Sequence, residues 1–396
     1  MAADLPKRPR LGRNVLALGV VSFLTDVATE MTYPLIPVFL ATVLGASATY
    51  VGTIEGAAET TAALLKWASG WWSDRVARRK PLVLAGYLLA SAVRPLTGLA
   101  QSALQVLGIR VADRVGKGIR TSPRDALIAD SVDAAIRGRA FGFHNAADNA
   151  GAVLGPLIAF AFLRWEGLPL RTVFLLTAIP GALAVLALIF GVREVPRTAP
   201  PKREGEAAGL KAPLGGRFWA YLGVLLLFTL GNSTDAFLLL RAGQLGVATS
   251  LIPILWALLN LVKALSNTPG GILSDRIGRK PLIAAGWLVY ATVYFLFGRA
   301  SQTWHAWALF AVYGVYFGLT EGVERALVAD LVPKNRRGAA FGWYNLAIGV
   351  GALPASLLFG ALWDRWGSAT AFNFGALLAL AAGVGVIFVI PRRATA

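Results

Sequence analysis

The sequence predicts an all-α membrane protein in which twelve transmembrane helices form two pseudo-symmetric six-helix bundles. Three observations support this prediction: the composition, a series of twelve apolar stretches and an internal repeat. Of the 396 residues, 56% are apolar and only 15% are charged, whereas a soluble domain is typically about 25% charged. The chain contains no cysteine, which excludes a secreted scaffold held together by disulfides. The composition therefore indicates a chain that crosses the bilayer many times.

Twelve stretches are long and apolar enough to cross a hydrocarbon core of about 30 Å, which takes about 20 residues of helix. The pattern typical of a β-barrel, with strands of alternating polarity, is absent. The expected spans are residues 14–40, 49–69, 80–100, 103–124, 139–163, 171–192, 217–240, 249–269, 280–298, 303–328, 338–361 and 368–390.

Most of the net charge of +17 comes from the connections between these spans. Basic residues gather before the first span and in every second connection, while the alternate connections carry few of them. By the positive-inside rule, both termini lie in the cytoplasm of a multi-pass protein of the cell (inner) membrane. Because the basic residues alternate with apolar spans and do not cluster on a polar domain, the expected surroundings are the lipid bilayer and not a nucleic acid.

Residues 193–216 form one long polar stretch with four prolines and mixed charge. This composition predicts a flexible cytoplasmic linker. It would join an N-terminal bundle of residues 1–192 to a C-terminal bundle of residues 217–396. No coiled-coil segment indicates an obligate oligomer, so we expect a monomer.

The two halves repeat each other. Asp130 recurs as Asp330, and residues 137–145 recur as 337–345 with the same offset of 200. Because the equivalent segments fall in connections on the same side, the repeat has parallel topology. Two parallel six-helix halves with a binding site between them are typical of secondary transporters.

The connection after the second span of each half carries a related motif. In the second half it reads Gly-x-x-x-Asp-Arg-x-Gly-Arg-Lys, and in the first half Ala77 replaces the second glycine. The motif residues are Gly271, Asp275, Arg276, Gly278 and Arg279 in the second half and Gly70, Asp74, Arg75 and Arg79 in the first. With this motif at both expected places, the chain resembles the major facilitator superfamily over essentially its whole length. The resemblance implies that these residues form a cytoplasmic gate, in which the aspartates stabilise the outward-open state.

Two further segments resemble motifs of the drug:proton antiporter branch of that family, whose members have twelve helices. Arg114 to Gly118 resembles a proton-linked motif, with Lys117 in place of glutamine. Gly151, Gly155 and Pro156 resemble the glycine-rich antiporter motif, although close helix packing through small residues is the alternative. No nucleophile–base pair, zinc motif or phosphate-binding loop is found, so we do not expect an enzyme.

Charged residues inside the spans should face a cavity or a partner, because each costs roughly 3 kcal/mol or more in the membrane. Asp26 and Glu30 lie one turn apart in the first span, as do Glu55 and Glu59 in the second. In the resembled family, these helices face the fourth, where a stripe of charged residues runs from Arg110 to Arg124. Desolvation favours the protonated form of a carboxyl group, which makes Asp26 our first candidate for a proton carrier. The proton-coupling candidates are Asp26, Glu30, Glu59, Asp113, Arg114 and Lys117.

The second half carries fewer charges, and Tyr313 stands at the repeat position of Asp113. We therefore expect it to supply an aromatic wall for the substrate, although core packing is the alternative for any single aromatic residue. The substrate-cavity candidates are Arg110, Asn145, Asp148, Asn149, Asp235, Trp256, Asn260, Tyr313, Tyr316, Trp343 and Tyr344.

These features predict a secondary active transporter that works by alternating access, with proton-coupled export of small organic or amphipathic molecules as the first expectation. Proton-coupled uptake or exchange of an organic anion is the alternative. The expected partner is a small-molecule substrate. No cofactor and no metal site are expected, and the driving force would be a proton gradient, with sodium as the other choice.

Overall fold

A computed structural model describes residues 11–73, 76, 78–133, 136–195, 214–333 and 336–390. Asp74 and Arg75 of the first motif and residues 196–213 of the expected linker therefore lie outside the described residues. Within the described residues, every regular element is a helix.

The first half of the chain supplies six spans, three of which are divided into shorter helices. Its elements are α1 (Arg13–Thr32), η1 (Tyr33–Leu35), α2 (Ile36–Thr42), α3 (Ala48–Ser73), α4 (Lys80–Val93), η2 (Arg94–Leu99), α5 (Ala103–Asp130), α6 (Arg137–Arg164), α7 (Leu170–Leu176) and α8 (Ala178–Gly191). The changes to 3-10 geometry coincide with Pro34 and Pro95, because proline removes a backbone donor and disturbs the regular α-helix.

The second half follows the same plan. Its elements are α10 (Gly216–Gly231), α11 (Ala236–Gln244), η4 (Thr249–Leu251), α12 (Ile252–Ile277), α13 (Arg279–Arg299), α14 (Thr303–Asp330), α15 (Arg337–Trp366) and α16 (Ser368–Val389).

Ten helical stretches among the described residues are long and apolar enough to cross a membrane. The other two expected spans coincide with α3 and α5. Both helices are as long as the others, but they carry the acidic pair and the charged stripe that lower their hydropathy. Two of the acids of α3 form ion pairs with arginines of α5, as described below.

The expected span at 217–240 is broken in the structure. Residues Asn232 to Asp235 leave the helical conformation and separate α10 from α11. The physical reason lies in the sequence Asn-Ser-Thr-Asp, whose short polar side chains compete with the helix for backbone hydrogen bonds. The backbone N–H of Ala236, for example, donates a hydrogen bond to the Thr234 hydroxyl.

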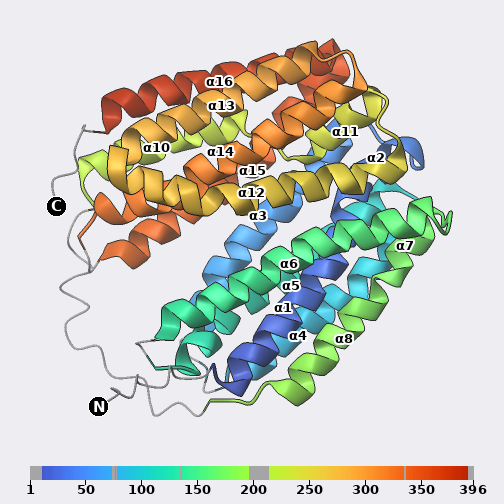
Figure 1. Cartoon of the computed structure of the whole chain (residues 1–396), viewed down its shortest axis with the longest axis vertical. Helices are drawn as coiled ribbons and strands as arrows, with labels where there is room; N and C mark the ends of the chain where they lie inside the picture. Colours follow the sequence, from blue (N-terminus) through green and yellow to red (C-terminus); the bar gives the residue numbers. More distant parts are fainter. Residues whose placement is uncertain are drawn as a thin grey trace, which may run out of the picture.

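The helices form two bundles that meet along two interfaces (Figure 1). In the first bundle α1 packs on α6 and α3 on α5, and in the second α12 packs on α14 and α13 on α16. Between the bundles, α3 packs against α15 and α6 packs against α12. Because α3 is the repeat counterpart of α12, and α6 that of α15, the two interfaces are related by the internal symmetry.

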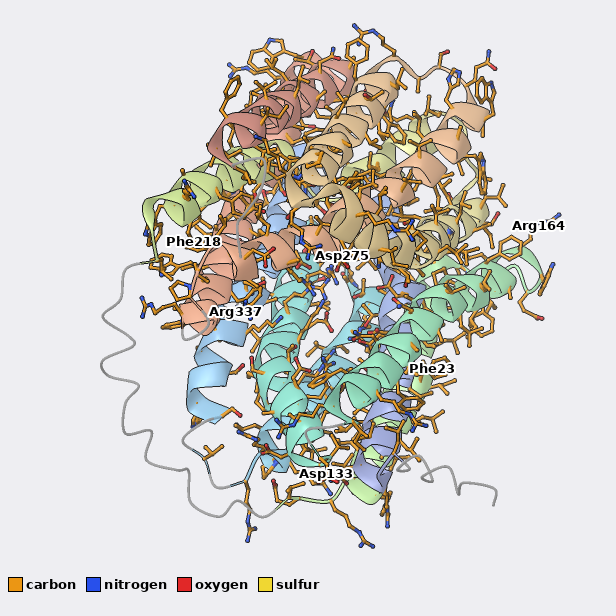
Figure 2. The ribbon with its side chains drawn as sticks, turned by 60° about the vertical axis from the view of Figure 1, so that its left-hand side comes forward. Phe23, Asp133, Arg164, Phe218, Asp275 and Arg337 are labelled. Atoms are coloured by element: carbon orange, nitrogen blue, oxygen red, sulfur yellow. The ribbon has the colours of Figure 1, made fainter. Side chains whose placement is uncertain are left out.

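The two ends of the molecule differ in charge. We call the end at which α5 finishes and α6 starts the basic end, because the Arg- and Lys-rich connections lie there, and the opposite end the far end. Figure 2 shows Asp133 at the basic end and Arg164, the last residue of α6, at the far end. Successive spans run in opposite directions, so a residue's position along its helix shows which end it is near.

Candidate functional site

A cavity of about 790 Å³ lies between the two bundles. It is lined by α1, α3 and α5 of the first half and by the 232–235 break, α12, α14 and α15 of the second. It extends toward the basic end, where Gly342 and Asn345, near the start of α15, belong to its wall. The charged and aromatic lining residues are Asp26, Glu30, Glu55, Glu59, Asp235, Lys66, Arg114, Lys117, Arg120, Lys263, Tyr33, Trp67, Trp256, Tyr313 and Phe317.

The acids of α3 form ion pairs with the basic stripe of α5. Arg110 donates from Nε and Nη2 to the two oxygens of Glu55, at 2.9 and 2.5 Å. One turn further along both helices, Arg114 lies 3.1 Å from Glu59. Glu55 is 1% exposed, whereas the side chain of Glu59 is 47% exposed and faces the cavity. The spacing of four residues places both pairs on the contacting faces of the two helices.

Asp113 lies behind this wall, among three guanidinium groups. Arg94 donates to it at 2.8 Å, and Arg110 and Arg114 approach it at 3.8 and 3.7 Å. Neither Asp113 nor Arg110 lines the cavity. Buried charges are tolerated when they are paired in this way, and these contacts place Asp113 where it can hold the guanidinium groups together.

We expected the acids of α1 to face the basic stripe of α5, as the acids of α3 do, but among the described residues they form no ion pairs with it. Glu30 accepts a hydrogen bond from the indole Nε1 of Trp256, at 2.6 Å, across the boundary between the bundles. Asp26 forms neither a hydrogen bond nor an ion pair with any described residue, although it lines the cavity. Arg110 and Arg114 are bound to the acids of α3, whereas Lys117 and Arg120, the α5 cations that act on Asp26, form no ion pair with it.

Lys117 is the counterpart of Asp26 on the opposite wall. Its side chain is exposed to the cavity, and within the described part of the chain it forms no ion pair. The charged groups that act on it are Arg114, Glu59, Asp26 and Arg120. The cavity therefore offers an unpaired carboxyl group, Asp26, that can take a proton or bind a cation, and an unpaired ammonium group, Lys117, that can bind an anionic substrate group. Lys66 and Arg120 also line it without an ion pair to a described residue.

Gly151 and Gly155 position the two acids of α1. A Cβ atom at Gly151 would lie 2.6 Å from the Phe23 carbonyl oxygen and 2.9 Å from the Cβ of Asp26. At Gly155 it would lie 2.7 Å from the Val27 carbonyl and 3.0 Å from the Cβ of Glu30. These glycines let α6 approach the backbone of α1 at the level of the cavity acids.

In the second half, the cavity wall combines aromatic rings with polar groups. Tyr313 donates from its hydroxyl to Asp235 at 2.7 Å, and the ring of Trp256 lies 5.0 Å from that of Tyr33 in the first half. Lys263 forms a 3.0 Å ion pair with Glu321 and lies 4.4 Å from the Phe317 ring.

Several substrate-cavity candidates do not line this cavity. Tyr316 is buried beside Tyr313, Tyr344 donates to the buried Glu324 at 2.9 Å, and Trp343 packs on Trp219. Packing within the second bundle therefore accounts for these three aromatic residues.

The polar candidates of α6 and α12 also lie outside the wall. Asp148 lies 3.8 Å from His144, and Asn260 donates to the Ala152 carbonyl across the bundle boundary at 3.4 Å. Asn145 and Asn149 are exposed on α6 and are not part of the lining.

The motif residues at the basic end form matching contacts in the two halves. Arg79 binds Ser73 and Asp130, and Arg279 binds Ser274, Asp275 and Asp330. These contacts remain within each half, since Ser274, Asp275 and Asp330 belong to the same bundle as Arg279.

The motif glycines differ in what they do. Gly278 has a φ of +96° and makes the turn between α12 and α13, a conformation that favours glycine. A Cβ atom added at Gly70 would lie 3.5 Å from the Ser122 hydroxyl, whereas one added at Gly271 would meet no atom within 4 Å. The Arg276 side chain is exposed.

Sequence reasoning missed three parts of the site. Asp235 was predicted, but Asn232, Ser233 and Thr234 beside it also line the cavity, because the helix breaks there. The Asn-Ser-Thr-Asp sequence indicates such a break. Trp67 and Arg120 also belong to the wall. Nothing in the sequence indicated that Thr60 of α3 would donate to the Gly349 carbonyl of α15, at 2.6 Å, because that bond depends on how the halves are docked.

Comparisons with known proteins agree with this architecture. The family model described as "Major Facilitator Superfamily" matches residues 18–262 and 221–396. The MFS-type transporter MJ1317 of Methanocaldococcus jannaschii is 34% identical over 385 residues, which cover 96% of this chain and 95% of that protein. The multidrug resistance protein MdtG of Serratia proteamaculans is 31% identical over 183 residues, 45% of this chain and 44% of its own length.

A solved structure with the same fold is that of a bacterial homologue of the human lysosomal transporter Spinster, in an inward-facing and unoccupied conformation. It has a TM-score of 0.73 at 18% identity and covers 95% of this chain and 94% of its own. At this identity the likeness concerns the fold.

Proposed function

The chain belongs to the major facilitator superfamily, and we propose that it is a proton-coupled secondary transporter that exports small organic or amphipathic molecules. It is a membrane transporter and not an enzyme. The proposal concerns the coupling ion, the direction of transport and the kind of substrate.

The observation that carries the proton coupling is Asp26, a cavity carboxylate without a hydrogen bond or ion pair among the described residues. Glu55 and Glu59 would each have to give up an arginine to take a proton, whereas Asp26 would not. Protonation of Asp26 changes the charge that faces Lys117 and the substrate, so that binding of the proton and of the substrate is linked.

The proposed orientation places the basic end in the cytoplasm, in line with the positive-inside rule. The cavity then extends toward the cytoplasm, and the far end is closed by contacts between the bundles. We propose that the protein works in this orientation as a monomer in the cell (inner) membrane, with both termini cytoplasmic.

Export is favoured by two features. The partial likeness to MdtG, a protein named for multidrug resistance, covers slightly less than half of the chain. The wall formed by Tyr33, Trp256, Tyr313 and Phe317 offers aromatic surface beside the free acid, which suits an amphipathic molecule.

A second candidate function is proton-coupled uptake or exchange of an organic anion. The observation that favours it is Lys117, which lines the cavity beside Arg114 and Arg120 and has no acidic partner within the described residues. If Asp26 is protonated, the local charge around Lys117 becomes more positive, which would strengthen the binding of an anion.

Reconstitution into liposomes with an imposed pH or sodium gradient tests these assignments. A panel of lipophilic cations, neutral amphiphiles and aromatic carboxylates is added, and a pH-sensitive dye reports proton movement. Proton movement opposite to the flux of a cation or neutral compound supports the exporter. Proton movement together with a carboxylate supports the second candidate. Saturable uptake of a panel compound that depends on sodium, or on neither ion, contradicts proton coupling.

A further inference from the structure

A carboxylate of the second bundle caps a helix of the first at the far end. Asp364, in the last turn of α15, accepts hydrogen bonds from the backbone N–H groups of Ala48 and Thr49, at 2.9 and 2.8 Å. These are the first two residues of α3. The hydroxyl groups of Ser47 and Thr49 also bind this carboxylate.

This contact is favourable for two physical reasons. The first N–H groups of a helix have no partner within the helix, and the N-terminus carries a partial positive charge that attracts an anion. Hydrogen bonds to a carboxylate are also roughly twice as strong as those between neutral groups. In an ordinary cap the acceptor belongs to the same chain segment, whereas here it comes from the other bundle.

The cap forms only when α3 and α15 are in close contact. Next to it, a Cβ atom at Gly360 would lie 2.7 Å from the Ala48 carbonyl oxygen, and one at Gly52 would lie 2.2 Å from the Ser356 carbonyl oxygen. Separation of the bundles at the far end must therefore break both backbone hydrogen bonds of Asp364. A cavity of about 490 Å³ adjoins the carboxylate, so that water can replace these bonds once they break.

Among the described residues, the symmetry-related interface between α6 and α12 has no such cap. The repeat counterpart of Asp364 is Arg164, at the end of α6, where the chain meets η4 and α12 of the second bundle. A guanidinium group cannot accept a hydrogen bond, and its charge is unfavourable at a helix N-terminus. Of these two interfaces, as far as the described residues show, the α3–α15 interface is therefore the one with a cap across the boundary between the bundles.

We propose that Asp364 is a conformational latch, which holds the far end closed by capping α3 and must release it before the cavity can open on that side. The inference rests on alternating access between the bundles, but not on the coupling ion or the substrate. It predicts that loss of the carboxylate shifts the resting protein toward the state that is open at the far end.

The test measures distances between spin labels in lipid nanodiscs, without substrate or gradient. Because the chain contains no cysteine, labels can be attached to introduced cysteines alone. The pair Leu104→Cys and Trp304→Cys reports the far end, at two exposed repeat-equivalent positions. The pair Gly138→Cys and Gly338→Cys reports the basic end, where an added Cβ atom meets no atom within 4 Å.

In the Asp364→Asn variant, we expect the far-end distance distribution to move to longer values and the basic-end distribution to shorter ones. The ratio of open to closed molecules should change on the order of tenfold, which corresponds to the loss of one charge-assisted hydrogen bond. Ala48→Pro removes one donor from the other side of the contact, at a helix position that tolerates proline. It should shift the distributions in the same direction.

Glu194→Gln is the matched control. The Glu194 carboxylate accepts from the backbone N–H groups of Arg79 and Lys80, both at 3.0 Å, and so caps α4 within the first bundle. Its loss should leave both distance distributions unchanged. Unchanged distributions in a monodisperse Asp364→Asn protein, or equal shifts in Asp364→Asn and Glu194→Gln, would overturn the latch. Neither result would bear on proton coupling.

Discussion

The indole nitrogen of Trp256 donates a 2.6 Å hydrogen bond to the carboxylate of Glu30, and this bond joins the two bundles at the wall of the cavity. The donor lies on α12 and the acceptor on α1, so that the acid is satisfied only while these two helices face each other. The contact therefore makes the environment of a cavity acid depend on how the bundles are docked.

Trp256→Phe should destabilise the protein by about 1–3 kcal/mol, because it leaves the half-buried Glu30 carboxylate without its donor. The measurement is the apparent midpoint of thermal unfolding in detergent. Trp219→Phe is the control, since Trp219 is half-exposed and its ring packs on Trp343 outside the cavity. Equal midpoints for the two variants would show that the bond contributes nothing.

Glu55→Gln should destabilise the protein by about 3–5 kcal/mol, because it leaves Arg110 as a buried charge without its bidentate partner. Glu59→Gln provides the comparison, since the Glu59 side chain is 47% exposed and water can replace part of its contact with Arg114. We expect a clearly smaller loss there, measured as the denaturation midpoint of each purified variant. A larger loss for Glu59→Gln would contradict the described burial of the two pairs.

Gly151→Ala should push α6 away from α1, because the added methyl group has no room against the Phe23 carbonyl and the Asp26 Cβ. The expected result is a lower unfolding temperature together with reduced transport. Gly142→Ala on the same helix meets no atom within 4 Å and should leave both properties unchanged. If Gly151→Ala were as stable and as active as Gly142→Ala, the glycine would have no packing role.

Much of the fold could be predicted from the sequence, because hydropathy and the 200-residue offset are local or periodic signals. The pairing of Glu55 and Glu59 with the stripe of α5 also follows from helical spacing, once the helix arrangement implied by the family resemblance is added. The break at residues 232–235 was missed, because the surrounding residues are apolar enough to be read as one helix.

The composition of the cavity wall was harder to predict. Trp343 and Tyr344 have the residue types expected of a substrate wall, but one packs on Trp219 and the other binds the buried Glu324. The rotation of a helix about its axis decides which residues face the cavity, and only three-dimensional packing fixes that rotation. The Asp364 cap depends on the contact between halves in the same way.

Lys117→Gln tests which charge the substrate carries. If the substrate is an organic anion, removal of the free cation should reduce its apparent affinity by tenfold or more, in keeping with about 1.5–3 kcal/mol for a hydrogen bond to a charged group. Lys117→Arg should restore most of that loss. Uptake of each panel compound in liposomes provides the measurement. An unchanged affinity for every transported carboxylate would remove Lys117 from substrate binding.

We propose that Asp26 carries the coupling proton, and substrate-induced proton movement in liposomes tests this role most directly. A compound transported by the wild type is applied to Asp26→Asn, and to Asp125→Asn as a control, because Asp125 pairs with Arg124 outside the cavity lining. We predict that proton movement is lost in Asp26→Asn and retained in Asp125→Asn, with both proteins folded and inserted. Proton movement in Asp26→Asn with the same pH dependence as the wild type would contradict the account.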